Sequence, residues 1–307
     1  CRGQILHLAL GMQILLCRLA EYLPFHRILL GRPKAWQLVA YSLCLSFGFR
    51  LLLDRESRPK EKRQRTLRLV LFLCAALGAI SLLPIRSRVP RVWVLDIGQG
   101  DSIVIEQGSR CITIDGGSTS RPDCGKQIIE PFLMSRALGT VDAAFLTHAD
   151  LDHTNGLSYL ASKGSGILVK RVILNPAAET DAHYAKLMAA LRENPETELF
   201  FMGAGDVYGN FHCLWPPREV LPEEVNEQSL ILLFTANGKR CLFTGDAGQP
   251  SEEKLLARLA APERAAERAA LTDIDLLKVG HHGSRGASSE AFLALLSPAC
   301  ALISCGR

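Results

Sequence analysis

The protein has 307 residues, of which 48% are hydrophobic and 21% are charged, and this composition excludes a disordered or low-complexity chain. Its formal net charge of +4 is unevenly divided, because residues 1–90 hold 15 Lys and Arg against 4 Asp and Glu, whereas residues 91–307 hold 20 against 27. The imbalance predicts two differently built parts, 1–90 and 91–307, and argues against a nucleic-acid binder held by bulk positive charge.

Two apolar runs in the first part are close to the length that spans a bilayer. Residues 36–53 and 67–85 each carry one charge, Arg50 and Arg68, near the end that faces the loop between them. Since about 20 apolar residues cross a hydrocarbon core, we expect two transmembrane helices, with buried core helices as the alternative. Residues 4–30 are interrupted by charges and a proline, which predicts an imperfect span or an interfacial helix.

The charge of the loop between these runs predicts their orientation. The segment from Arg50 to Arg68 contains eight Lys and Arg against three acidic residues, whereas only three arginines follow the second run, up to Arg91. Positively charged loops stay on the cytoplasmic side of a membrane. We therefore expect a multi-pass cell-membrane protein in which residues 91–307 are extracytoplasmic.

From Val92 onward the pattern is that of a layered α/β or α+β domain of about 200 residues. Short β-rich runs read VWVLDI, SIVIE, RCITID, AAFLTH, RVILN, SLILLFT and KRCLFTG. Helix-like stretches lie near residues 126–138, 153–162, 180–192, 251–260 and 288–296. An Asn237-Gly238 dipeptide joins the last two β-rich runs, which is typical of a tight hairpin. The order predicts sheets covered by helices.

The strongest chemical signal is the segment T-H-A-D-L-D-H, which follows the β-rich run AAFLT. It places His148, Asp150, Asp152 and His153 at the point where the next helical stretch opens. Imidazole and carboxylate together are a set that divalent transition ions bind. Taken alone, the segment has a polar loop with a helix cap as its alternative interpretation.

Two later clusters strengthen the metal interpretation. Asp246 in F-T-G-D-A and the pair His281-His282 in K-V-G-H-H-G-S each stand at the end of a β-rich run. Strand ends of one layer form one edge, so these segments are expected to meet the T-H-A-D-L-D-H segment there. Four of the eight histidines fall in these three places.

Five motifs in this order resemble those of the metallo-β-lactamase fold, and more narrowly the C-terminal domain of ComEC-type competence proteins, the membrane channels of bacterial DNA uptake. The motifs are LDIGQGDS at 95–102, IDGG at 114–117, HADLDH at 148–153, FTGDA at 243–247 and LKVGHHGS at 277–284. The resemblance implies a metallo-β-lactamase-like αββα sandwich at 91–307, preceded by transmembrane helices. It implies that 1–90 ends a polytopic membrane domain, and that further C-terminal strands and a later histidine of the family lie beyond Arg307.

The resemblance also implies the ligands of one or two divalent metal ions. His148 and Asp150 would serve the first ion, Asp152 and His153 the second, Asp246 would bridge them, and His281 or His282 would complete the second site. We favour His282 as the ligand and His281 as a contact to substrate, because adjacent residues of an extended segment point to opposite sides. Asp152 is also a candidate proton acceptor, with the ligand role favoured.

The sequence departs from the broader superfamily pattern at the first metal position. Asp150 stands where most members have a second histidine, and no histidine precedes SLILLFT, where Asn226 is the nearest candidate. A site with one nitrogen among mostly oxygen ligands shifts the preference away from zinc. We expect manganese or zinc as the cofactor, with magnesium as a further candidate.

Three other residues have both a functional and a purely structural interpretation. Asp115, which ends a β-rich run, is expected to orient a metal ligand through a hydrogen bond. Asp101 belongs either to a tight glycine turn or to the rim of the cleft, and Lys278 is either structural or a phosphate contact. The lone His183 is expected to be a surface or packed histidine.

The function that the resemblance implies is a metal-dependent hydrolase on a DNA-uptake channel, which cleaves phosphodiester bonds of the DNA strand that is not imported. Its partners would be DNA, the membrane and other competence proteins. The acidic balance of residues 91–307 weighs mildly against DNA affinity, since phosphate contacts need Lys and Arg. Two alternatives are an extracytoplasmic phosphoesterase that acts on a cell-wall or lipid head group, and a non-catalytic docking or gating module.

Overall fold

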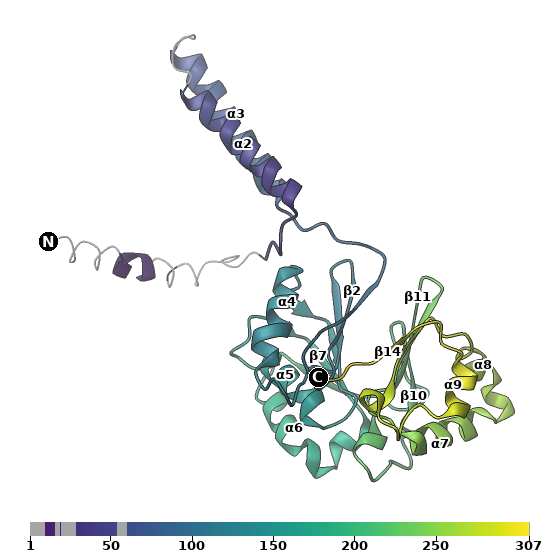
Figure 1. Ribbon diagram of the computed structural model, residues 1–307. Helices are drawn as coiled ribbons and strands as arrows, with labels where there is room; N and C mark the ends of the chain where they lie inside the picture. The colour runs from purple at the N-terminus through teal and green to yellow at the C-terminus, as the bar shows by residue number, and fades with distance from the viewer. Residues whose placement is uncertain (1–9, 16–18, 20–28, 54–59, 307) are drawn as a thin grey trace. The chain divides into compact units, whose positions relative to one another are not determined.

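The computed structural model describes residues 10–15, 19, 29–53 and 60–306 of the chain (Figure 1). The chain divides into two compact units, Cys1–Pro84 and Ile85–Arg307, and each is described by itself. The interrupted apolar stretch expected at residues 4–30 lies largely outside the described residues.

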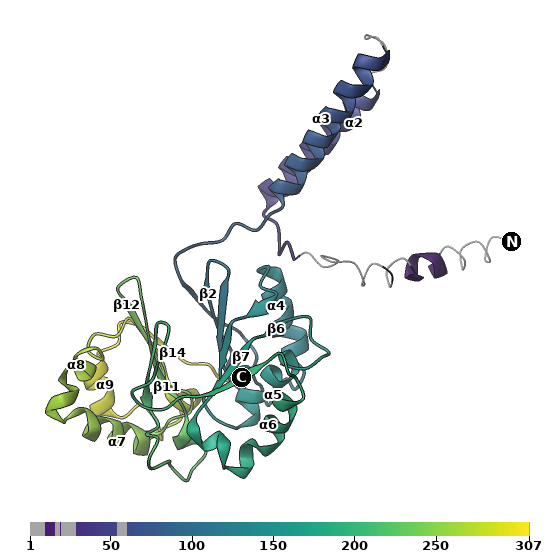
Figure 2. The ribbon, with the colours of Figure 1, turned by 180° about the vertical axis from the view of Figure 1, so that it is seen from behind.

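The first unit contains a helical hairpin made of α2 (Ala35–Leu53) and α3 (Lys60–Ser81), which lie side by side in Figures 1 and 2. Glycines allow the two helices to approach closely. A Cβ atom added to Gly78 would stand 3.0 Å from Cδ2 of Tyr41, and one added to Gly48 would stand 3.4 Å from a methyl group of α3. The apolar runs of the sequence therefore pack on each other through their small residues.

Gln37, at the start of α2, is hydrogen-bonded to the backbone at the end of α3. Its side-chain amide donates hydrogen bonds of 2.7 Å and 3.0 Å to the carbonyl oxygens of Ser81 and Leu83. Its side-chain oxygen accepts the backbone N–H of Lys34 at 2.8 Å. Gln37 is buried, and both polar atoms of its side chain are hydrogen-bonded. The residue thereby joins the start of α2 to the end of α3.

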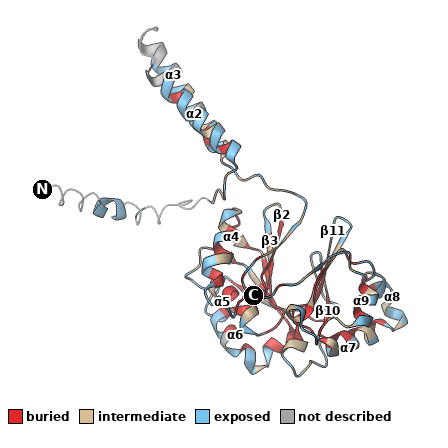
Figure 3. Ribbon diagram, viewed as in Figure 1, coloured by how far each residue is buried: buried red, intermediate tan, exposed pale blue. Residues whose placement is uncertain are grey.

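Many large apolar side chains of α2 and α3 are exposed. Figure 3 shows most of the described part of both helices in the colour of exposed residues. In the part of the chain that the structure describes, however, no helix combines the length and the apolar character needed to cross a membrane. The helices predicted at 36–53 and 67–85 are present, but they are not found to be membrane spans. The second run continues a helix that begins earlier, at Lys60, within the charged sequence KEKRQR.

The second unit is built on two six-stranded sheets. The first has the order β1 (Arg91–Val94), β2 (Ile103–Gln107), β3 (Arg110–Ile114), β5 (Ala143–Phe145), β7 (Arg171–Leu174) and β8 (Glu198–Phe201). The second has the order β14 (Ala301–Leu302), β13 (Leu276–Lys278), β12 (Lys239–Phe243), β11 (Ile231–Ala236), β10 (Phe211–Trp215) and β9 (Val207–Tyr208). A small parallel pair is formed by β4 (Thr140–Val141) and β6 (Leu168–Val169).

Helices cover the outer face of each sheet, as Figures 1 and 2 show from opposite sides. The first sheet carries α4 (Glu130–Ser135), α5 (Leu151–Leu160) and α6 (Ala185–Arg192), and the second carries α7 (Gln249–Leu259), α8 (Ala265–Ala269) and α9 (Glu290–Leu296). Short 3-10 or π turns occupy Gly125–Ile129, Pro176–Glu179, Ala182–Tyr184, Asn226–Gln228, Pro262–Arg264 and Gly280–Gly283.

Alternating side chains of the strands fill three apolar layers. Phe145, Phe211 and Phe243 belong to the layer between the sheets, and the aromatic rings of Phe145 and Phe211 lie 4.6 Å apart. Leu157 of α5 packs in the layer outside the first sheet, and Leu255 of α7 in the layer outside the second. The layers follow the order helix, sheet, sheet, helix, so the predicted αββα sandwich is confirmed.

Most of the predicted elements have counterparts, including the hairpin turn between β11 and β12. Asn237 and Gly238 have φ angles of 51° and 73°, the left-handed values that such a turn requires. The strands β4, β6, β8, β9 and β10 were not among the predicted β-rich runs. Two of them, β8 and β9, are edge strands with exposed positions, and these lack the apolar pattern of a buried strand.

Candidate metal centre

The parallel strands of both sheets bring the motif residues to one edge. In the first sheet, Ile114 of β3 is paired with Phe145 of β5, so Asp115 and the segment after β5 leave the sheet together. In the second sheet, Phe243 of β12 is paired with Lys278 of β13, which places the F-T-G-D-A and G-H-H-G segments next to each other.

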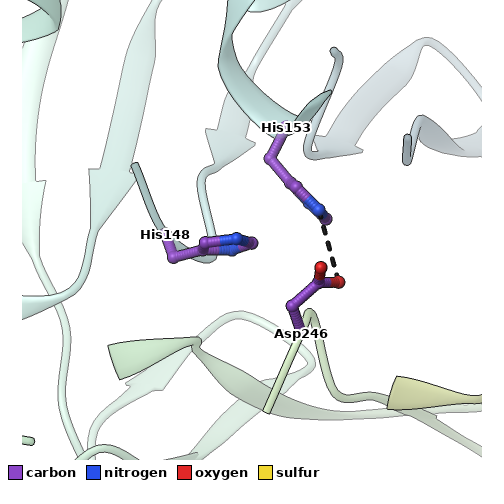
Figure 4. Close-up of side chains that lie close together, drawn as sticks. All are labelled: His148, His153 and Asp246. Carbon is purple, nitrogen blue, oxygen red and sulfur yellow. Dashed lines mark ion pairs between the residues drawn. The ribbon is translucent and has the colours of Figure 1, made fainter. Parts of the chain in front are cut away.

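Side chains from these segments converge on one another. The ligand atoms of His148, His153 and Asp246 lie within 4.8 Å of each other, and those of Asp152, His153 and His282 form a second group of the same kind. Figure 4 shows the first group, with Nε2 of His153 standing 3.3 Å from Oδ1 of Asp246. The other carboxylate oxygen of Asp246 lies 3.3 Å from Nε2 of His282.

A buried carboxylate orients the ring of His153. Asp115 accepts a hydrogen bond of 2.9 Å from Nδ1 of His153, and it also accepts the backbone N–H of Thr147 at 2.8 Å and the Thr147 hydroxyl at 2.9 Å. Because an ionised carboxylate only accepts, Nδ1 of His153 carries a proton, and Nε2, which faces Asp246, is the ring atom that can bind a metal ion. This is the orienting role expected for Asp115.

Thr147 orients the ring of His148 in the same way. Its hydroxyl proton is donated to Asp115, so its oxygen acts as the acceptor for Nδ1 of His148 at 3.0 Å. Nε2 of His148 is then the ring atom that can bind a metal ion. Ser229 lies 3.3 Å from Nδ1 of His148 and accepts the backbone N–H of Asp246 at 3.0 Å. In the segment before β11, where Asn226 was the nearest candidate, Ser229 is the residue that contacts this ring.

The His281-His282 segment does not have the extended form on which its prediction rested. Both residues adopt left-handed backbone angles, with φ of 47° and 53°. This turn directs His282 into the cluster, where its Nδ1 donates a 2.8 Å hydrogen bond to the carbonyl oxygen of Ser304. His281 belongs to neither ligand group, and its ring centre is 6.3 Å from that of His282. The structure thus brings His282 rather than His281 to the centre, for a different physical reason.

Four ligand atoms of the cluster have no hydrogen-bond partner. These buried atoms are Nε2 of His148, Nε2 of His153, Nε2 of His282 and Oδ1 of Asp246. A buried polar atom left unpaired costs about 1–3 kcal/mol, so four of them facing one place call for a common partner. Imidazole nitrogens with carboxylate oxygens form a donor set that suits Zn²⁺ or Mn²⁺. The residues present therefore fit a divalent metal ion.

The charges around the rings favour a cation at this place. Burial opposes protonation of His153, but Asp115 and Asp246 raise the pKa of its ring well above the ordinary value. His282 behaves likewise, since Asp152 and Asp246 outweigh burial and raise its pKa to about 10. Burial works against ionisation of Asp246, yet the adjacent His153 holds the pKa of this carboxyl far below its usual range. The rings of His153 and His282 therefore bind an additional proton when they hold no metal ion.

Metal binding should consequently depend on pH. Because His153 and His282 have raised pKa values, an incoming ion must displace their protons, and binding should tighten as the pH rises. We expect the dissociation constant of Mn²⁺ or Zn²⁺ to fall about tenfold per pH unit for each proton released. Calorimetry in buffers of different ionisation enthalpy measures both the affinity and the number of protons released. An affinity that stays constant between about pH 6 and pH 8 would contradict this linkage.

The two aspartates of the T-H-A-D-L-D-H segment have different surroundings. Asp152 lies 3.4 Å from Nε2 of His282; burial opposes its ionisation, but the adjacent His282 ring holds its pKa below the ordinary value. The side chain of Asp150 is 49% exposed and lies 3.6 Å from Nε2 of His148, and this neighbouring ring lowers the pKa of Asp150. Asp150 is in none of the ligand groups. It stands at the N-cap of α5, but its side chain makes no capping hydrogen bond.

Two buried residues of the centre, Asp101 and Lys278, were left between a structural and a functional interpretation by the sequence. The Lys278 ammonium donates a 2.8 Å hydrogen bond to the carbonyl oxygen of Gly245 and contacts the carboxylate of Asp101. Burial lowers the pKa of Lys278, but the charges of Asp101 and Asp246 outweigh it and raise that pKa. A signal was present in the sequence, because a lysine inside the apolar run L-L-K-V needs a buried anion beside it.

Comparisons with known proteins show which proteins this chain is similar to. A family model described as the Metallo-beta-lactamase superfamily matches residues 95–307. ComE operon protein 3 of Bacillus subtilis is 30% identical over 252 residues, which are 76% of this chain and 30% of that protein. Recombination protein 2 of Haemophilus influenzae is 27% identical over 219 residues, 71% of this chain and 24% of that protein.

The chain spans less than a third of the length of these curated relatives. Among solved structures, the metallo-beta-lactamase fold protein YhfI of Bacillus subtilis is 16% identical. The similarity covers 61% of this chain and 70% of that one, with a TM-score of 0.38.

Proposed function

The chain belongs to the metallo-beta-lactamase superfamily and to its ComEC-type competence proteins, and from this premise we propose that it is a metal-dependent phosphodiesterase of DNA uptake. Its substrate is DNA, and it cleaves phosphodiester bonds of the strand that is not imported during natural transformation. Its other partners are the membrane and further competence proteins.

A single observation carries the proposal of hydrolysis. Three buried Nε2 atoms and one carboxylate oxygen of Asp246 face one place and lack any hydrogen-bond partner. We assign His148, His153, Asp152, Asp246 and His282 as the residues that hold the metal, with Asp150 at the exposed side of His148. When bound, a divalent ion lowers the pKa of water from ~15.7 to about 7 and polarises the phosphoryl oxygen.

The residues of the chain perform the remaining tasks. Asp115 and the carbonyl group of Ser304 hold the rings of His153 and His282 so that each Nε2 atom faces Asp246. The ionised Asp152 accepts hydrogen bonds and serves as a ligand, with proton acceptance as its second role. His281 lies beside the cluster without joining it, which suits a residue that contacts substrate.

The first unit supports attachment to a membrane. Its helices α2 and α3 present exposed apolar side chains. The most exposed of these include Leu43, Phe47, Phe49, Phe72 and Ile80. We propose that this surface lies in lipid or against other parts of a multi-pass channel, with residues 91–307 on the extracytoplasmic side.

The experiment is a cleavage assay with the purified protein and end-labelled single-stranded and double-stranded DNA. We expect cleavage with Mn²⁺ or Zn²⁺, weaker or no cleavage with Mg²⁺, and none with a chelator. A small aryl phosphodiester and a lipid head-group phosphodiester are assayed in parallel. Cleavage of these two phosphodiesters without cleavage of DNA would favour the phosphoesterase alternative. The excess of acidic over basic residues in 91–307 is the observation that favours this alternative. No cleavage of any of them with metal bound would favour a docking or gating module.

A further inference from the structure

Lys278 is the last residue of β13 and is buried inside the centre, with 2% of its side chain exposed. Its ammonium lies between two carboxylates, in contact with Asp101 and 3.6 Å from Oδ1 of Asp246. A third contact is the hydrogen bond to the carbonyl oxygen of Gly245. The ammonium is thus surrounded by oxygen atoms, as a bound cation would be.

The position of this ammonium coincides with one of the groups that could hold a metal ion. Asp101, Asp246 and His282 offer ligand atoms within 4.8 Å of one another. The two carboxylates of that group are already bridged by Lys278. A divalent ion placed there would meet a positive charge within a few ångströms, and like charges at such distances disfavour each other strongly in a buried site.

The remaining groups offer a place for one ion at a time. They are His148, His153 and Asp246; Asp152, His153 and His282; and Asp101, Asp115 and His153, so all three depend on His153. The Nδ1 atom of His153 is engaged by Asp115, so the ring offers a single nitrogen, Nε2, to a metal ion. One imidazole lone pair binds one metal ion.

We propose that the ammonium of Lys278, held between Asp101 and Asp246, takes the place of a second metal ion in this centre, so that each chain binds a single divalent ion. The inference rests on the metal site of the proposed function and deepens it. It assigns Lys278 and Asp101 as positioning residues: the pair holds Asp246 by charge and leaves its carboxylate oxygens directed at His153 and His282.

The test counts metal ions rather than activity. The full chain is dialysed against Mn²⁺ at increasing concentration, bound manganese is measured by mass spectrometry, and electron paramagnetic resonance reports whether two ions are coupled. The wild-type protein should bind one Mn²⁺ per chain with an uncoupled spectrum. The variant Lys278→Met, of similar length and without charge, should bind two per chain, because Asp101 and Asp246 become available to a second ion.

A matched control is Lys239→Met, which removes the same charge from an exposed lysine paired with Asp275. It should bind one ion with unchanged affinity. Should Lys278→Met not fold, the double variant Asp101→Asn/Lys278→Met removes the pair as a unit. This variant should bind one ion, about tenfold more tightly than wild type because the repulsion by the ammonium is gone.

Three results would overturn the inference. They are two coupled ions in the wild-type protein, one ion of unchanged affinity in Lys278→Met, and unchanged affinity in the double variant. A wild-type protein that binds no divalent ion would instead reject the metal site of the proposed function. The two failures are therefore distinguishable by the same measurement.

Discussion

Replacement of His153 by glutamine should abolish metal binding and phosphodiester cleavage together, with activity lower by about a thousandfold or more. His153 belongs to both ligand groups of the centre, and its Nε2 atom lies 3.3 Å from Asp246. Glutamine preserves much of the size of the ring but provides no nitrogen lone pair, because its amide nitrogen only donates. The measurements are the metal content of the purified variant and its rate of DNA cleavage.

The control for this change is His183→Gln. His183 is exposed and paired with Asp181 in the same manner as His153 is paired with Asp115, but it is in no ligand group. This variant should keep its metal and its activity. Cleavage by His153→Gln at a rate near that of wild type would contradict the assigned centre.

Replacement of Asp115 by asparagine should weaken metal binding by about 10- to 100-fold, although Asp115 is assigned no contact with the ion. The Asp115 carboxylate accepts three hydrogen bonds, from the backbone and hydroxyl of Thr147 and from Nδ1 of His153. An asparagine amide supplies one oxygen and one NH₂ group, so one of these donors would face another donor. The ring of His153 can relieve that conflict by moving its proton to Nε2, which removes the lone pair that binds metal.

Nuclear magnetic resonance of ¹⁵N-labelled histidine measures this change of tautomer, and calorimetry measures the metal affinity. Asp181→Asn is the matched variant, since Asp181 likewise holds a histidine and accepts a backbone N–H, but outside the cluster. It should leave metal affinity unchanged. Unaltered affinity in Asp115→Asn would show that the carboxylate does not set the tautomer of His153.

Local signals in the sequence were sufficient for much of the fold. The Asn237-Gly238 turn and the strands on either side of it follow from backbone preferences that act over a few residues. The same holds for the apolar β-rich runs, whose side chains fill the layer between the two sheets. Edge strands such as β8 were missed because their side chains are half exposed and carry little pattern.

The residues of the metal centre were predicted only in part from the sequence. The position of His148, His153 and Asp246 after strands predicted that they would meet, and the structure brings them together. The assignment of His282 over His281 rested on an extended backbone that does not exist there, because both residues are left-handed.

The sequence by itself determined the layered fold, the edge at which the ligand-type residues gather and the family of the chain, since strand periodicity and short motifs are properties of neighbouring residues. Only the tertiary structure decided that Lys278 lies between Asp101 and Asp246, and that Asp115 and Ser304 engage the Nδ1 atoms of His153 and His282 and leave their Nε2 atoms as the ones that can bind a metal ion. The physical reason is that tautomer and charge pairing depend on atoms a few ångströms apart in space, whose residues are separated by up to about two hundred positions in the chain.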